Sequence, residues 1–93
     1  MQGESIKNMI WHYRHIKKLR QADLAFILGH KDASQISCYE RGLVMPDFEQ
    51  LWKISQVLDV GPEALFPAQV EQWSQELIEH YRQLAETKEN IHG

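Results

Sequence analysis

The feature that most constrains this chain is Gly29, which interrupts a stretch of helix-forming residues near its middle. Ahead of it, Leu24, Ala25 and Leu28 have the spacing of residues that share one buried face of a helix. Glycine ends helices readily because it adopts the left-handed conformation without a Cβ clash. We therefore expect a short helix that begins near Gln21 and ends at Gly29.

A second short helix is predicted directly after this turn. Asp32 can accept a hydrogen bond from the free N–H groups of a helix over residues 33–41, and Gly42 ends it. Ile36 is its main apolar anchor. The polar or weakly apolar residues that it leaves exposed are Ser34, Gln35, Ser37 and Cys38. A helix that buries so little is expected to be presented outward.

These residues form a pattern known from one family. The pattern Gln21-x-x-Leu24-Ala25-x-x-x-Gly29, then Ile36-Ser37-x-x-Glu40-x-Gly42, then Pro46, resembles the helix-turn-helix of phage repressors of the Cro/CI (XRE) type. The resemblance runs from about Ile10 to Phe66 and covers five helices. It implies an all-α, phage-repressor-like domain over residues 5–66. In that family the second helix of the motif enters the major groove of double-stranded DNA, and the first crosses the backbone.

Two departures from the commonest members concern how DNA would be contacted. The turn His30-Lys31-Asp32 is one residue longer, which bears on the angle of the second helix. The outward face also has neither an arginine nor a run of glutamines, so the sequence preference stays open.

The side chains predicted to contact DNA follow from the position of Ile36. Residues 33, 34, 37 and 38 project from the opposite side of that helix, and 41 follows one turn on. The full predicted set is Gln21, Lys31, Ala33, Ser34, Gln35, Ser37, Cys38 and Arg41. The serines suit base edges or phosphates, and Ala33 and Cys38 suit a thymine methyl group.

The remaining members of that set have separate roles. Gln35 lies nearer the flank and suits adenine if the longer turn rotates the helix, and Lys31 and Arg41 suit phosphates. The family resemblance implies a backbone contact for Gln21 at the helix N-terminus. The alternative for the serines is that they only solvate an exposed helix.

A charged residue is expected to face the body of the domain. Glu40 follows Ile36 by one helical turn, and an unpaired buried carboxylate is costly. The family usually supplies an arginine from its first helix, and Arg14 stands at the matching place. Arg14 and Glu40 are therefore predicted to form a structural ion pair with no catalytic role.

The flanking helices follow from capping and apolar spacing. After a frayed start over residues 1–4, Ser5 is expected to cap a helix that runs to about Lys17. Its predicted apolar stripe is Ile6, Met9, Ile10, Tyr13 and Ile16. Asp47, with Gln50 in a capping box, begins a helix over residues 48–58 that packs through Leu51, Trp52, Ile54, Ser55 and Leu58. Gly61-Pro62 begins a short helix through Phe66.

The C-terminal region, residues 67–90, is a candidate dimerisation element. After Pro67 a helix is predicted over about residues 68–89. Its apolar stripe is Val70, Trp73, Leu77, Ile78, Tyr81 and Leu84, and its other faces are acidic. Such a helix either folds back on the domain or pairs with its equivalent in a second chain, and we favour a homodimer.

Charge is distributed unevenly along the chain. The formal net charge is −3, yet residues 1–53 hold 8 Lys/Arg against 6 Asp/Glu, and residues 54–93 hold 2 against 7. Phosphate attraction depends on where the cations sit, so the mildly basic half can bind DNA, weakly and with a strong salt dependence. A single cysteine, and no signal peptide or apolar run long enough for a membrane, favour a cytoplasmic protein.

The motifs of common enzyme classes are missing from the sequence. There is no glycine-rich phosphate loop and no convincing nucleophile with its base. His12 and His15 are spaced for one face of a helix, but no second cluster completes a zinc site. We therefore expect no catalysis, cofactor or metal. The favoured function is a small transcriptional regulator, a repressor; the alternative is an antitoxin or protein-interaction module whose tail binds a toxin or another protein.

Overall fold

The computed structural model describes the backbone of residues 5–92 and the side chains as far as residue 89. Six helices run in the order α1 Ile10–Ile16, α2 Gln21–Ile27, α3 Ser34–Glu40, α4 Phe48–Leu58, α5 Pro62–Leu65 and α6 Pro67–His92. No strand occurs within the described residues. The predicted all-α class, five helices followed by a long C-terminal one, is confirmed. The frayed start predicted for residues 1–4 lies outside the described part.

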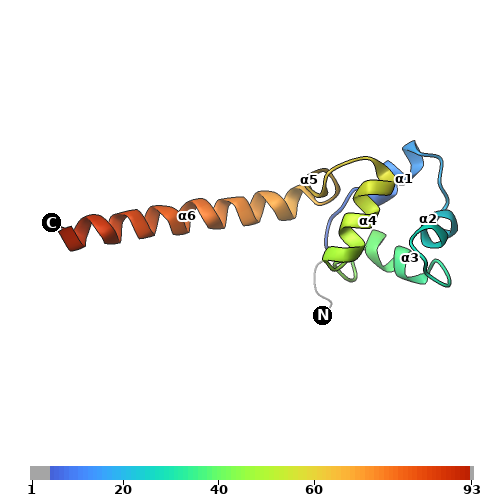
Figure 1. Ribbon diagram of the computed structural model, residues 1–93, viewed down its shortest axis with the longest axis horizontal. Helices are drawn as coiled ribbons and strands as arrows, with labels where there is room; N and C mark the ends of the chain where they lie inside the picture. Colours follow the sequence, from blue (N-terminus) through green and yellow to red (C-terminus); the bar gives the residue numbers. More distant parts are fainter. Residues whose placement is uncertain (1–4, 93) are drawn as a thin grey trace.

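Helices α1 to α5 pack into a small unit, which we call the head (Figure 1). Its core takes one or two apolar side chains from each helix, together with Leu28 and Phe66 at helix ends. The buried residues are Ile10, Leu24, Ala25, Leu28, Ile36, Tyr39, Ile54, Leu58, Leu65 and Phe66. Because α2 and α3 have only seven residues each, tertiary packing rather than local propensity must hold them helical.

The start of α1 differs from the prediction, because Asn8 and not Ser5 shapes this segment. Asn8 Oδ1 accepts a hydrogen bond from the N–H of Ile10 at 3.1 Å, and its Nδ2 donates to the carbonyl of Tyr39 at 2.9 Å. The N–H of Ile6 donates to the Gly42 carbonyl at 2.9 Å. These bonds hold residues 5–9 against the end of α3 in a non-helical form, so α1 begins only at Ile10.

Two side chains predicted to be packed are exposed instead. Ile16 is 59% exposed because α1 ends there and the chain turns away at Lys18, which has φ +60°. Trp52 is 52% exposed because only one face of α4 is covered. That face buries Ile54 and Ser55, and the Ser55 hydroxyl donates to the Trp52 carbonyl at 2.7 Å.

The remaining helix starts show the expected chemistry with one difference. Asp47 Oδ1 accepts from the N–H of Gln50 at 2.9 Å and begins α4. The Gln50 side chain does not complete the predicted capping box, because it bonds to the turn after α2. Pro62 occupies the first turn of α5, where a missing N–H costs nothing.

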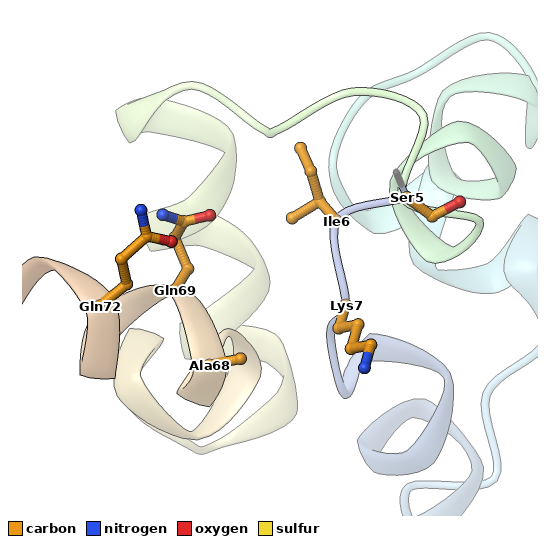
Figure 2. A pocket seen from close by; sticks show the side chains of 6 residues that line it. All are labelled: Ser5, Ile6, Lys7, Ala68, Gln69 and Gln72. Carbon is orange, nitrogen blue, oxygen red and sulfur yellow. The ribbon is translucent and has the colours of Figure 1, made fainter. Parts of the chain in front are cut away.

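Helix α6 leaves the head as a single straight rod (Figure 1). It begins at Pro67 itself, a residue suited to the first turn of a helix. Every described residue from 71 to 89 is exposed, and the molecule measures 60 × 35 × 21 Å along its principal axes. Figure 2 shows the junction, where Gln69 and Gln72 of α6 line a groove whose other side is the segment of residues 5–7. The head thus covers only the first turn of α6.

Candidate nucleic-acid interface

Helix α3 is anchored at two points and exposed elsewhere. Ile36 is fully buried and Tyr39 is 4% exposed, and these two side chains attach the helix to the core. Ser34 and Gln35 at its start are exposed, and Ser37 and Cys38 are half-buried. Helices α2 and α3 lie at the end of the head opposite the point where α6 leaves it (Figure 1). The outward side of α3 is therefore accessible to a large ligand, as the sequence led us to expect.

The turn between α2 and α3 is fixed by local hydrogen bonds. Gly29 has φ +82°, and the N–H of His30 donates to the Ala25 carbonyl at 2.9 Å, which closes the end of α2. Asp32 Oδ1 accepts from the N–H of Ser34 at 2.9 Å, and this bond lowers the pKa of Asp32. Helix α3 begins at Ser34, one residue later than predicted.

A side-chain bond that the sequence analysis missed ties this turn to α4. His30 Nε2 lies 2.7 Å from Gln50 Oε1, so Nε2 is the donor and carries the hydrogen. His30 belongs to the longer turn, and Gln50 lies in the first turn of α4. The bond joins residues 20 positions apart, and no periodicity in the sequence could have indicated it. It fixes the turn relative to the start of α4.

Arg14 and Glu40 lie together beneath α3. Arg14 Nε donates to Glu40 Oε2 at 2.6 Å, and Nη2 donates to Oε1 at 2.9 Å, a bidentate pair with side chains only 7% and 5% exposed. The remaining Nη1 of Arg14 donates to the Leu19 carbonyl at 2.8 Å, in the turn between α1 and α2. One guanidinium therefore fixes the end of α3 relative to two other segments.

Gln21 joins the same network. Its Nε2 donates to Glu40 Oε1 at 3.0 Å, so the amide that the resemblance assigned to a DNA phosphate also satisfies the buried carboxylate. An amide nitrogen has two hydrogens, and the second stays available to a phosphate. Gln21 opens α2, and the bond holds this helix start beside the end of α3.

The predicted contact residues fall into an exposed and a half-buried group. Lys31, Ser34, Gln35 and Arg41 are exposed. Gln21, Ala33, Ser37 and Cys38 are half-buried. Arg41 closes α3 and keeps its guanidinium exposed, with Nε 3.4 Å from the Ser37 carbonyl. Ser34, Cys38 and Arg41 share the helix side opposite Ile36, and Gln35 and Ser37 flank it.

The basic residues before α2 are partly engaged within the chain. Lys17 Nζ lies 4.0 Å from Asp59, and the Arg20 guanidinium donates to Asp23 Oδ1 at 2.8 Å. Both cations stay largely accessible, with side chains 41% and 82% exposed. They can therefore add to the positive potential around the N-terminus of α2.

His15 of α1 has ordinary partners within its own helix. His15 Nδ1 lies 2.8 Å from the Trp11 carbonyl, and the two rings stack with centroids 3.8 Å apart. Within the described residues, no group of three or more His, Cys, Asp or Glu side chains gathers as a metal would require. None of the described helices, the 26-residue α6 included, has the length and apolarity needed to cross a bilayer.

Comparison with known proteins agrees with this geometry. No curated protein matches the chain. A family model described as helix-turn-helix matches residues 13–65, which include most of α1 and all of α2 to α5. The match covers more than half of the chain and contains the Arg14–Glu40 pair, the turn and α3. The chain belongs to the XRE-type helix-turn-helix family of DNA-binding regulators.

Proposed function

We propose that the protein is a transcriptional repressor that binds specific double-stranded DNA with α3 in the major groove. The proposal rests on the way in which neighbouring side chains hold α3. A seven-residue helix has its outer side free while a buried ion pair, an amide and a turn histidine fix its tilt. Such rigid support is what base readout requires, because a contact must be held to within a fraction of an ångström.

The contacts divide into two kinds. Ser34, Ser37 and Cys38 are proposed to face base edges, where hydroxyls exchange hydrogen bonds and the thiol meets a thymine methyl group. Lys31, Arg41 and Gln21 are proposed to contact phosphates and so set the position of α3 along the groove. Ala33 and Gln35 lie at the edge of this surface and add to base contact. The head forms one DNA-binding domain over residues 5–66, and residues 67–90 serve assembly.

The protein is proposed to act as a homodimer through α6, since one small head supplies few phosphate contacts. A dimer doubles the phosphates neutralised and reads two half-sites. A regulator of this kind acts in the bacterial cytoplasm, where its DNA is found, and needs neither a cofactor nor catalysis.

The test is a DNA-binding measurement on duplexes selected from a random pool. Fluorescence anisotropy at several salt concentrations gives the affinity and its salt slope. Arg41→Ala is expected to weaken binding to all duplexes and to reduce the salt slope by about one. Ser37→Ala is expected to alter the ranking of duplexes. Lys7→Ala, which removes an exposed lysine beside the start of α6 and outside the proposed contact surface, is the matched control and leaves both unchanged. Equal binding by Arg41→Ala and the wild type would reject this surface.

A second candidate function is supported by the exposure of α6. Its acidic, apolar-striped surface suits a second protein, as in an antitoxin that binds its toxin, with the head reading DNA or not. Two results together would favour this candidate over a repressor: co-purification of another protein at a fixed ratio, and a DNA affinity that does not change with salt concentration.

A further inference from the structure

The apolar stripe of α6 lies outside the head and has no partner within the described chain. Trp73 is 45% exposed, Leu77 63%, Ile78 62%, Tyr81 75% and Leu84 50%. A cluster of large apolar side chains of this extent on a helix marks a contact surface. The chemistry of the stripe indicates what covers it.

The spacing of the stripe fits pairing with a second straight helix. Val70, Leu77 and Leu84 recur every seven residues, and Ile91 continues the series in the sequence. A second series with the same period, Ser74, Tyr81 and Lys88, lies beside it. Two interleaved seven-residue series form the seam of a two-helix coiled coil, and Trp73 and Ile78 of the stripe flank this seam.

The charges of α6 distinguish the two possible directions of pairing. Residues 67–79 carry the glutamates 71, 76 and 79 and no Lys or Arg. Residues 80–92 carry the glutamates 86 and 89, balanced by Arg82 and Lys88. Parallel pairing would place two acidic halves side by side. Antiparallel pairing places each acidic half beside a neutral one, and it also aligns the helix dipoles favourably.

The sizes of the seam residues point the same way. In a parallel pair each seam residue meets its own copy, which sets Ser74 against Ser74 and Lys88 against Lys88. The first contact leaves a gap and the second is repulsive. In an antiparallel pair centred on residue 79, Ser74 meets Leu84, and Lys88 meets Val70 next to the acidic Glu71. Each layer then combines a smaller with a larger side chain.

We infer that α6 pairs with α6 of a second copy of this chain in antiparallel orientation, centred near Glu79. The inference rests on the homodimer proposed above and specifies its geometry. The two heads then lie at opposite ends of a shared rod. The starts of the two α6 helices are about 36 Å apart along it, at a rise of about 1.5 Å per residue.

This geometry restricts how one dimer can meet DNA. In each head α3 lies beyond the start of α6, at the far end of the head (Figure 1). The two α3 helices are therefore separated by more than about 35 Å, one turn of the double helix. Half-sites within a single turn cannot both be bound by one dimer, so the operator selected by the full-length protein contains more widely spaced half-sites.

The test measures distances between spin labels in the full-length dimer without DNA. Labels are attached at Glu79→Cys and, separately, at Glu89→Cys, each with Cys38→Ser to remove the natural thiol. Both positions are exposed and lie off the seam. Antiparallel pairing predicts that the two labels at residue 79 lie at almost the same height along the rod. The two labels at residue 89 should be offset along the rod by about 30 Å. Leu77→Asp is the control that abolishes the coupling while amide exchange in the head stays unchanged.

Two outcomes would overturn the inference. Similar distances at the two positions would mean parallel pairing. No dipolar coupling at either, with a monomer in sedimentation, would mean that a second copy does not cover the stripe. Because the distances are read without DNA, a failure of the protein to bind any duplex would reject the repressor proposal and leave this inference intact.

Discussion

The head and α6 use apolar side chains in opposite ways. In the head Leu24, Ile36 and Ile54 are fully buried, and helices of seven residues exist only because their neighbours cover them. In α6 Leu77 and Tyr81 are 63% and 75% exposed on a helix of 26 residues. Head stability is therefore a property of one chain, whereas no other segment of the described chain buries the α6 stripe, and under the proposed dimer its burial would depend on concentration.

Their ion pairs differ in the same way. The Arg14–Glu40 pair lies beneath α3 with side chains no more than 7% exposed. Arg82 pairs with Glu79 and Glu86 along α6, and all three side chains are about half-exposed. A buried pair sets geometry because removing one member leaves an unpaired charge, whereas an exposed pair contributes little. Substitutions should therefore damage the fold in the head and the assembly in α6.

The largest effect is expected from Arg14→Met. It leaves the buried Glu40 carboxylate with only the Gln21 amide, and it is expected to cost about 3–5 kcal/mol of unfolding free energy. Arg20→Met removes an exposed arginine that pairs with Asp23, and its cost should be far smaller. Urea unfolding of the two variants measures the difference. Equal losses would mean that the buried pair has no special role.

The next largest effect is expected from Gly42→Ala. Gly42 has φ +72°, and an added Cβ would lie 2.6 Å from the backbone nitrogen of Ile6. Strain and clash together are expected to cost about 2–3 kcal/mol. Gly29→Ala is the matched control, since Gly29 has φ +82° but open space around it, and strain alone costs about 1 kcal/mol. The same urea titration compares them, and a larger loss for Gly29→Ala would contradict the close approach of Ile6.

In α6 the expected effect moves from folding to assembly. Leu77→Ala removes a seam side chain and is expected to raise the dimer dissociation constant at least about tenfold. Amide exchange of Leu24 and Ile54, which lie in the head, should not change. Gln75→Ala on the opposite side of α6 is the control and should leave both quantities as they are. Sedimentation over a concentration series measures the dissociation constant, and weakened protection of the head would show that the two regions are coupled.

Local patterns made much of the head predictable. The signals at Gly29, Leu24 and Asp47 act through residues no more than four positions away. The sequence therefore predicted α2, the turn after it and the start of α4. The partner of Glu40 came from the family resemblance, since no local rule links two residues 26 positions apart.

What could not be predicted depends on contacts between distant segments. Asn8 holds the chain against Tyr39, 31 residues away, and thereby delays α1. The His30–Gln50 bond likewise joins a turn to another helix. Exposure of Trp52 reflects which face of α4 the core covers, and apolarity alone does not reveal it. The DNA contacts stay a prediction because they involve a partner outside the chain.

The smallest effect concerns two carboxylates that form ion pairs near the surface, one in each region. The hydrogen bond from the Arg20 guanidinium, and then that from the Arg20 N–H, lower the pKa of Asp23 from 3.8 to about 2. Hydrogen bonds from Arg82 and then Gln83 likewise lower the pKa of Glu79. A pKa lowered by folding stabilises the folded state above the ordinary pKa, and this contribution is lost as the pH falls through the folded value.

Asp23→Asn is therefore expected to lower the melting temperature of the head slightly at neutral pH, and the difference from wild type should disappear as the pH falls through about 2. Glu79→Gln removes a carboxylate of the same kind from α6, where it supports only the rod. It should leave exchange of Leu24 unchanged at every pH. Melts and amide exchange over a pH series test both variants. If Glu79→Gln destabilised the head as Asp23→Asn does, α6 would support the fold of its own chain, and the contrast between the two regions would fail.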